Sequence, residues 1–179
     1  MARIVLAWEL GGDYGHIGRL LPLALEFQRR GHQPLFVIRE LAGAESLLQP
    51  HGLTWFQAPL WIGRVENLPE AAGYAEMLMR FGFLNPRALT GIARTWRHLF
   101  STLAADMVVM DHAPTALLAS RGLGLARVNL GDGFCIPPAT RPLPLFHWWQ
   151  AGNAVRQADS EEKVRQVINE VLARLDAPP

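Results

Sequence analysis

Residues 3–38, RIVLAWELGGDYGHIGRLLPLALEFQRRGHQPLFVI, decide the fold because they contain one complete strand–helix–strand unit. Residues 3–8 are an almost continuous apolar run, which is typical of a strand buried on both faces of a parallel sheet. From Ile17 onward, apolar side chains recur at helical spacing until Gly31 ends the predicted helix. Residues 33–38 form the second apolar run. The spacing predicts a β-α-β unit with a glycine-rich loop after its first strand.

The rest of the chain continues this alternation. Three further strands are predicted over residues 53–58, 106–111 and 125–130, with helical stretches between them. Alternating strands and helices with right-handed crossovers predict an α/β fold, with a parallel sheet of about five strands and helices on both faces. Residues 131–158 show no predicted element. A last helix is expected to begin at Ser160, an N-cap residue that two glutamates follow.

The composition limits the possible partners and the compartment. The chain has 179 residues, half of them apolar, a size that suits one compact domain. A formal net charge of +1 and the lack of a Lys/Arg stripe argue against a nucleic-acid partner. The single cysteine, Cys135, cannot form an internal disulfide, and no apolar run approaches the ~20 residues that span a bilayer. We therefore expect a cytoplasmic protein whose membrane contact, through the aromatic residues 145–149, is peripheral at most.

Two side chains are expected to meet at one edge of the predicted sheet. His16 lies in the glycine-rich loop that follows the first strand, and Asp111 ends the strand predicted over residues 106–111. Ligands of open parallel sheets bind outside the carboxyl ends of the strands. If the two strands are neighbours, the carboxylate can contact one nitrogen of the imidazole. Such a contact fixes the tautomer and raises the basicity of the other nitrogen, as a general base requires.

Structural roles are open for the same residues. Asp111 precedes a predicted helix with Pro114 in its first turn, so it could instead be the N-cap of that helix. His16 could be an ordinary turn residue, and Asp13 a solvated aspartate of the loop.

Phosphate and metal motifs are absent from the sequence. The glycine-rich loop lacks the lysine and the serine or threonine of a P-loop, and its glycine spacing is not that of G-x-G-x-x-G, so nucleotide binding at this loop is not expected. His51, His112 and His147 lack the spacing of metal ligands, so no metal site is expected.

Three segments resemble a known family. GGDYGHIGRLLPLALEFQRRGHQPLFV (residues 11–37) is similar to the opening of the GT-B glycosyltransferases, in particular the UDP-glycosyltransferase and macrolide-glycosyltransferase group. DMVVMDHAPTALLASRGLGLARVNL (106–130) resembles their strand–Asp–helix–strand segment, and VRQVINEVLARLDAPP (164–179) resembles a helix late in their N-terminal domain. The three segments occur in the family's order. The resemblance implies the Rossmann-like N-terminal half of a GT-B fold.

The resemblance also implies roles for individual residues. The family's catalytic histidine, a general base, falls on His16, and the aspartate that orients it falls on Asp111. The family's N-terminal domain binds the acceptor, for which we expect a small or lipid-like molecule with apolar or aromatic character. The candidate substrate-binding residues lie in the glycine-rich loop and in an aromatic segment expected to overhang the cleft: Gly12, Asp13, Gly15, Trp61 and Phe81.

The family's second domain, which binds the nucleotide sugar, has no counterpart in this sequence. We therefore interpret residues 1–179 as one acceptor-binding domain, truncated and in need of a donor-binding domain or partner chain. No cofactor is expected beyond the nucleotide sugar as co-substrate. Two alternatives remain: a non-catalytic split subunit that recruits a donor-binding partner, and a sugar-nucleotide epimerase-like enzyme of the same fold.

Overall fold

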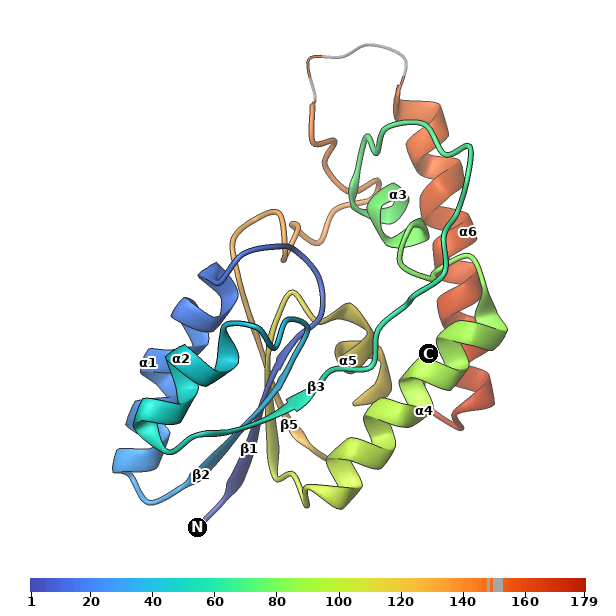
Figure 1. Cartoon of the computed structure of the whole chain (residues 1–179). Coiled ribbons are helices and arrows are strands. Elements are labelled where there is room, and N and C mark those ends of the chain that lie inside the picture. The colour runs from blue at the N-terminus through green and yellow to red at the C-terminus, as the bar shows by residue number, and fades with distance from the viewer. Residues whose placement is uncertain (148, 150–152) are drawn as a thin grey trace. The chain divides into compact units, whose positions relative to one another are not determined.

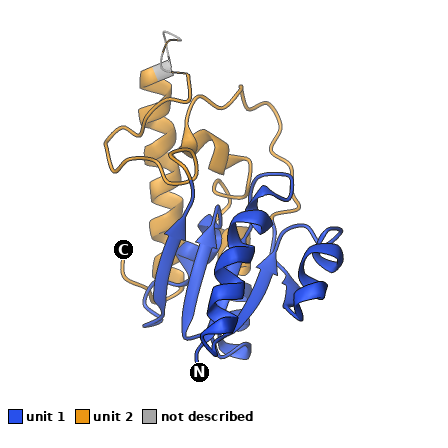
Figure 2. Cartoon of the chain, turned by 90° about the vertical axis from the view of Figure 1, so that its left-hand side faces the viewer, with its two compact units in different colours: residues 1–60, 93–131 blue, residues 61–92, 132–179 orange. Residues whose placement is uncertain are grey.

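The structure is a computed structural model that describes residues 1–147, 149 and 153–179 (Figure 1). The chain divides into two compact units (Figure 2). The first consists of Met1–Leu60 and Ala93–Gly131, and the second of Trp61–Ile92 and Asp132–Pro179.

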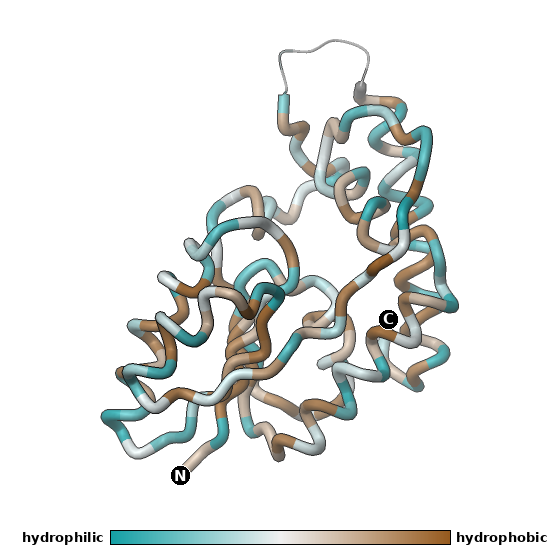
Figure 3. The backbone as a smooth tube through the Cα atoms, viewed as in Figure 1, coloured by the Kyte–Doolittle hydropathy of each residue, from teal (hydrophilic) through white to brown (hydrophobic). Residues whose placement is uncertain are grey.

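The first unit contains a five-stranded parallel sheet, as the sequence predicts. Its strand order is β3-β2-β1-β4-β5, and every neighbouring pair is parallel. The strands are β1 (Arg3–Trp8), β2 (Gln33–Ile38), β3 (Thr54–Gln57), β4 (Met107–Asp111) and β5 (Ala126–Leu130). Each predicted strand is confirmed to within a residue or two at its ends. The apolar runs of β1, β2 and β4 form buried strands, whereas β3 and β5, at the two edges of the sheet, are more exposed. The apolar colour of the inner strands is visible along the tube in Figure 3.

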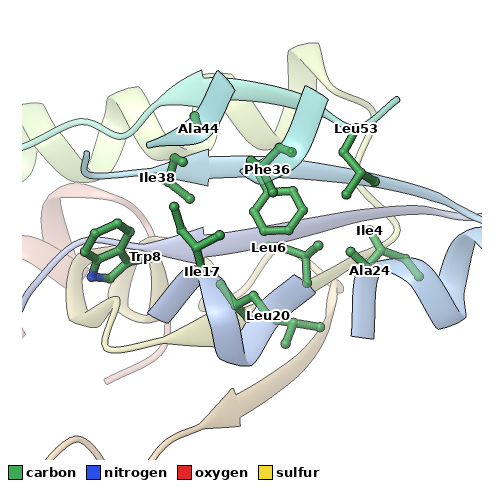
Figure 4. Close-up of a cluster of buried hydrophobic side chains, with 12 residues drawn as sticks. Ile4, Leu6, Trp8, Ile17, Leu20, Ala24, Phe36, Ile38, Ala44 and Leu53 are labelled. Atoms are coloured by element: carbon green, nitrogen blue, oxygen red, sulfur yellow. The ribbon is translucent and has the colours of Figure 1, made fainter. Parts of the chain in front are cut away.

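Helices lie on both faces of this sheet. In Figure 1, α1 (Gly15–Arg29) and α2 (Ala44–Leu48) lie on one side of the strands and α5 (Pro114–Ala119) on the other. A short 3-10 helix, η1 (Gln49–His51), follows α2. The core beneath α1 and α2 is built from alternate residues of β1 and β2, which meet apolar side chains of both helices (Figure 4). These core residues include Ile4, Leu6, Trp8, Ile17, Leu20, Phe36 and Ile38.

The named elements of the second unit are helices joined by long loops. It contains α3 (Tyr74–Met79), which packs against α6 (Asn153–Arg174). The remaining helix, α4 (Pro86–Thr102), begins in the second unit and ends in the first. An ion pair joins α3 to α6, with Arg156 Nε 2.8 Å from Glu76 Oε1.

The expected start of the last helix is wrong. Helix α6 begins at Asn153, seven residues before Ser160, so Ser160 lies inside the helix and is not its N-cap. Its buried hydroxyl instead donates to Glu76 Oε1 across 3.2 Å. A serine inside a helix is tolerated when its hydroxyl finds a partner on a neighbouring element. The first turns of α6 are polar and lack the apolar period that marks its later part, which is why the pattern placed the start too late.

Candidate active site at the carboxyl edge of the sheet

Strands β1 and β4 are neighbours, and their carboxyl ends are in register. Trp8, the last residue of β1, pairs with Asp111, the last residue of β4. After this point the chain leaves β1 toward α1 and leaves β4 toward α5, which lie on opposite faces of the sheet (Figure 1). The strand order reverses direction here, and ligands of open α/β sheets bind at such a switch point.

The expected approach of His16 to Asp111 is confirmed. His16 is the second residue of α1, and its Nδ1 lies 3.1 Å from Asp111 Oδ1. The Asp111 side chain is fully buried and His16 nearly so. The two groups are close but poorly aligned for a hydrogen bond. Within the described part of the chain, His16 Nδ1 makes no hydrogen bond of good geometry with any atom, and neither does the other carboxylate oxygen, Asp111 Oδ2. Catalytic hydrogen bonds are often loose without substrate, so the distance is compatible with a working pair.

Two aromatic rings lie near the imidazole of His16. Trp8 stacks on it with ring centroids 5.1 Å apart and an interplanar angle of 23°. The ring of His112 is near it as well, with a centroid distance of 6.0 Å and an interplanar angle of 35°. Contact with two rings from adjacent strand ends restricts the orientation of His16. The backbone of His112 is itself unusual, with a φ of 50°.

Among the loop glycines, Gly11 is the one that approaches His16 closely, and it is not among the site residues predicted from the sequence. Gly11 has a φ of 90°, and a Cβ on it would lie 2.5 Å from His16 Nε2. Only a residue without a side chain therefore fits at this close approach to Nε2, the nitrogen that faces away from Asp111. By contrast, a Cβ at Gly12 or Gly15 would meet no atom within 4 Å. Asp13 is exposed and adopts a φ of 62°.

Arg19 is a second residue that the sequence analysis missed. Its guanidinium Nη1 donates a hydrogen bond of 3.0 Å to Asp111 Oδ1, the same oxygen that faces His16. Arg19 lies three residues after His16 on α1, so both side chains project from one face of the helix. The buried carboxyl group of Asp111 thus contacts both the imidazole and a partly exposed guanidinium.

Glu9, the residue after β1, is the third missed residue. It is 2 % exposed, and its carboxylate accepts hydrogen bonds from the backbone N–H groups of Thr115 (2.9 Å) and Ala116 (2.6 Å) in the first turn of α5. Burial raises the pKa of Glu9 to about 7, although these two hydrogen bonds act in the opposite direction. The alternative role of Asp111 as the cap of this helix is therefore wrong. The N-cap position is Ala113, and the free backbone N–H groups of the first turn are hydrogen-bonded by Glu9, which follows strand β1.

Trp61 and Phe81 belong to the second unit. Trp61 packs against glycines, since a Cβ on Gly63 or Gly82 would lie within 3.0 Å of its ring. Its indole N–H is buried and has no hydrogen-bond partner among the residues that the structure describes. Phe81 is half-buried. Neither side chain lines the cavity of about 480 Å³ in this unit, whose walls include the rings of Tyr74, Phe134 and Phe146. Their role in acceptor binding stays a prediction.

The described ranges contain neither a candidate metal cluster nor a candidate membrane-spanning helix. No group of three or more His, Cys, Asp or Glu side chains there could hold a metal ion. No described helix is long and apolar enough to cross a membrane. Of the aromatic residues 145–149, Trp148 lies outside the described residues.

Solved structures share this fold. The chain matches the glycosyltransferase SsfS6 of Streptomyces sp. SF2575 with a TM-score of 0.54 and 15% identity, over 100% of this chain and 48% of that one. It matches the calicheamicin glycosyltransferase CalG4 with a TM-score of 0.57 and 20% identity, over 98% and 43%. For SnogD of Streptomyces nogalater the values are 0.52 and 18%, over 98% and 42%. The chain thus spans less than half the length of each protein, and the match is to the N-terminal half of the GT-B fold. No protein-family model and no curated protein matches the sequence.

Proposed function

We propose that this chain, whose fold is that of the N-terminal half of GT-B glycosyltransferases, is the acceptor-binding half of an inverting glycosyltransferase. His16 is the general base in this proposal, and Asp111 orients it. The observation that supports the proposal is the 3.1 Å approach of His16 Nδ1 to the buried Asp111 carboxylate at the carboxyl edge of the sheet. A carboxylate on Nδ1 leaves Nε2 to accept a proton.

The proposed reaction moves one sugar from a nucleotide-sugar donor to a hydroxyl of the acceptor. His16 Nε2 removes the hydroxyl proton while the acceptor oxygen attacks the anomeric carbon. The bond from that carbon to the donor phosphate oxygen breaks, and the nucleotide leaves with the electron pair. Attack from the side opposite the leaving group inverts the anomeric centre. The proton on His16 then passes to solvent, and Asp111 stabilises the imidazolium in the meantime.

The absence of a side chain at Gly11 fits this role, because Nε2 is the atom that must meet the acceptor hydroxyl. Gly12, Asp13 and Gly15 remain the proposed substrate-binding residues of the same loop. Gly15 begins α1, and a side chain on either glycine would enter open space. We further propose that Trp61 and Phe81 contact a small or lipid-like acceptor.

The donor is proposed to bind outside this chain, on a further domain or a partner chain, since the matched proteins are more than twice as long. The proposal includes a cytoplasmic location, in keeping with the single cysteine. Calorimetry of this chain with UDP- and dTDP-sugars is expected to give only weak heats. Submicromolar binding would contradict this division of labour.

The decisive test replaces His16 in an assembly that contains both halves. We expect His16→Ala to lower the rate of sugar transfer by about 10²–10⁴-fold, the usual contribution of a general base. His51→Ala is the matched control, because His51 is an exposed histidine of η1 in the same unit. Full activity of a folded His16→Ala protein would rule out the proposed base.

A further inference from the structure

We propose that Glu9 is a positioning residue for the His16–Asp111 pair, because its carboxylate fixes the turn between β4 and α5 that directly follows Asp111. The inference rests on the proposed function, but it concerns a residue that touches neither His16 nor the reacting atoms. Glu9 acts through backbone groups of the turn.

The side chain of Glu9 holds the far end of this turn. Its two carboxylate oxygens accept from Thr115 N and Ala116 N, one oxygen for each N–H group. The N-terminal amides of a helix have no partner within the helix and carry a partial positive charge, so a carboxylate is the group that suits them. The sequence separation exceeds 100 residues in both bonds. Glu9 therefore ties the end of β1 to the start of α5.

The backbone next to Glu9 holds the near end of the turn. The N–H groups of Glu9 and Leu10 both donate to the carbonyl oxygen of His112, at 3.3 and 3.0 Å. His112 adopts a left-handed φ of 50°, which a residue other than glycine adopts only when its surroundings hold it there. Asp111 is the last residue of β4 and directly precedes His112, so the conformation of this turn fixes the backbone on the carboxyl side of Asp111.

Several charged groups surround this arrangement. From the end of β2, Arg39 Nη1 donates to the backbone oxygen of Glu9 across 3.1 Å. His112 follows Asp111 on the turn, and His16 and Arg19 approach Asp111 from α1. None of the ion pairs described for this part of the chain includes Glu9, and the groups that lower its pKa are hydrogen-bond donors: the two backbone amides and the side chains of Thr115 and Trp96.

Protonation of Glu9 weakens its hydrogen bonds with the first turn of α5. The ionised carboxylate can accept from both amides at once. Once protonated, one oxygen carries a hydrogen and accepts more weakly, so Thr115 or Ala116 loses part of its hydrogen bond. Burial places the pKa of Glu9 at about 7, which makes the change observable under mild conditions.

The test follows the carboxyl carbons of Glu9 and Asp111 by NMR during a pH titration of this chain. We expect the Asp111 signal to show a step at the midpoint of the Glu9 titration, near pH 7. This step should vanish in Glu9→Gln and persist in His16→Gln, which removes the imidazole as a source of the change. Glu40→Gln is the matched control, because the exposed Glu40 also accepts a backbone N–H, from Ala42.

Two results would overturn the proposal. One is an Asp111 signal in His16→Gln that does not respond when Glu9 titrates, a measurement that does not depend on whether Glu9→Gln folds. The other is an unchanged step in folded Glu9→Gln. Transfer activity gives a separate readout: in an assembly of both halves, Glu9→Gln should lower kcat by about tenfold and leave KM nearly unchanged. Because the NMR titration needs no activity, the inference and the proposed function can fail independently.

Discussion

Gly11 lies so close to the imidazole of His16 that a side chain on Gly11 would collide with it. A Cβ on Gly11 would stand 2.5 Å from His16 Nε2, and the same residue has a φ of 90°. With any other residue type at position 11, the loop could not approach the imidazole this closely. Space for the side chain and backbone conformation both require glycine at this position.

Gly11→Ala should therefore displace the imidazole and strain the loop. We expect it to lower the free energy of unfolding by about 1–3 kcal/mol and to abolish any function that depends on Nε2. Gly12→Ala is the control, because its Cβ would meet nothing within 4 Å. Chemical denaturation and the NMR signals of the His16 ring measure the two effects. Equal behaviour of the two variants would show that the loop relaxes freely.

The buried Glu9 should make stability depend on pH. Because burial raises its pKa from 4.5 to about 7, its contribution is fully present below pH 4.5 and is lost as pH rises through 7. The loss is on the order of 3 kcal/mol. Glu9→Gln should flatten this part of the stability profile. Urea denaturation between pH 4.5 and 8, followed by the amide signals of β1, would detect it, and an unchanged slope in Glu9→Gln would contradict it.

Arg19 should stabilise the fold through its hydrogen bond to Asp111. Arg19→Met removes the hydrogen bond to the buried Asp111 Oδ1, and we expect a loss of about 1 kcal/mol because the guanidinium is 41 % exposed. Arg29→Met is the control on the same helix, since Arg29 pairs only with the exposed Glu26 among the described residues. The thermal midpoints of the two variants give the comparison. A loss for Arg29→Met as large as that for Arg19→Met would show that the contact with Asp111 adds nothing.

The second unit has its own buried carboxylate, with the opposite pH dependence. Glu76 is desolvated, which by itself raises its pKa, but Arg156, Ala72 N–H and Ser160 outweigh this and lower the pKa. Its contribution is present above pH 4.5 and is lost as pH falls through the lowered pKa.

Glu76→Ala should cost about 2 kcal/mol, because it leaves three donors without their acceptor. Glu170→Gln, which breaks an exposed pair with Arg174 on α6, should cost much less. Hydrogen exchange of the α3 and α6 amides measures both. Similar protection in the two variants would contradict a structural role for Glu76.

The sequence predicts the sheet well because strands and helices here are specified by local patterns. The same holds for the meeting of His16 and Asp111, which follows from two strand ends and one rule about parallel sheets. Glu9 could not be found in this way, since its two partners are more than 100 residues distant and a single acid after a strand is usually exposed. Arg19 was hidden because it occupies a polar position of an amphipathic helix. Gly11 could not be told from Gly12 without the backbone angles.

The stacking of Trp8 on His16 gives the protein an internal optical reporter. The two rings are 5.1 Å apart, and Trp8 is fully buried, with its indole N–H bonded to the carbonyl oxygen of Leu10. A protonated imidazole quenches the fluorescence of an adjacent indole more strongly than a neutral one. A variant that retains Trp8 alone among the six tryptophans would thus report the charge of His16 as emission intensity, in real time and without a label.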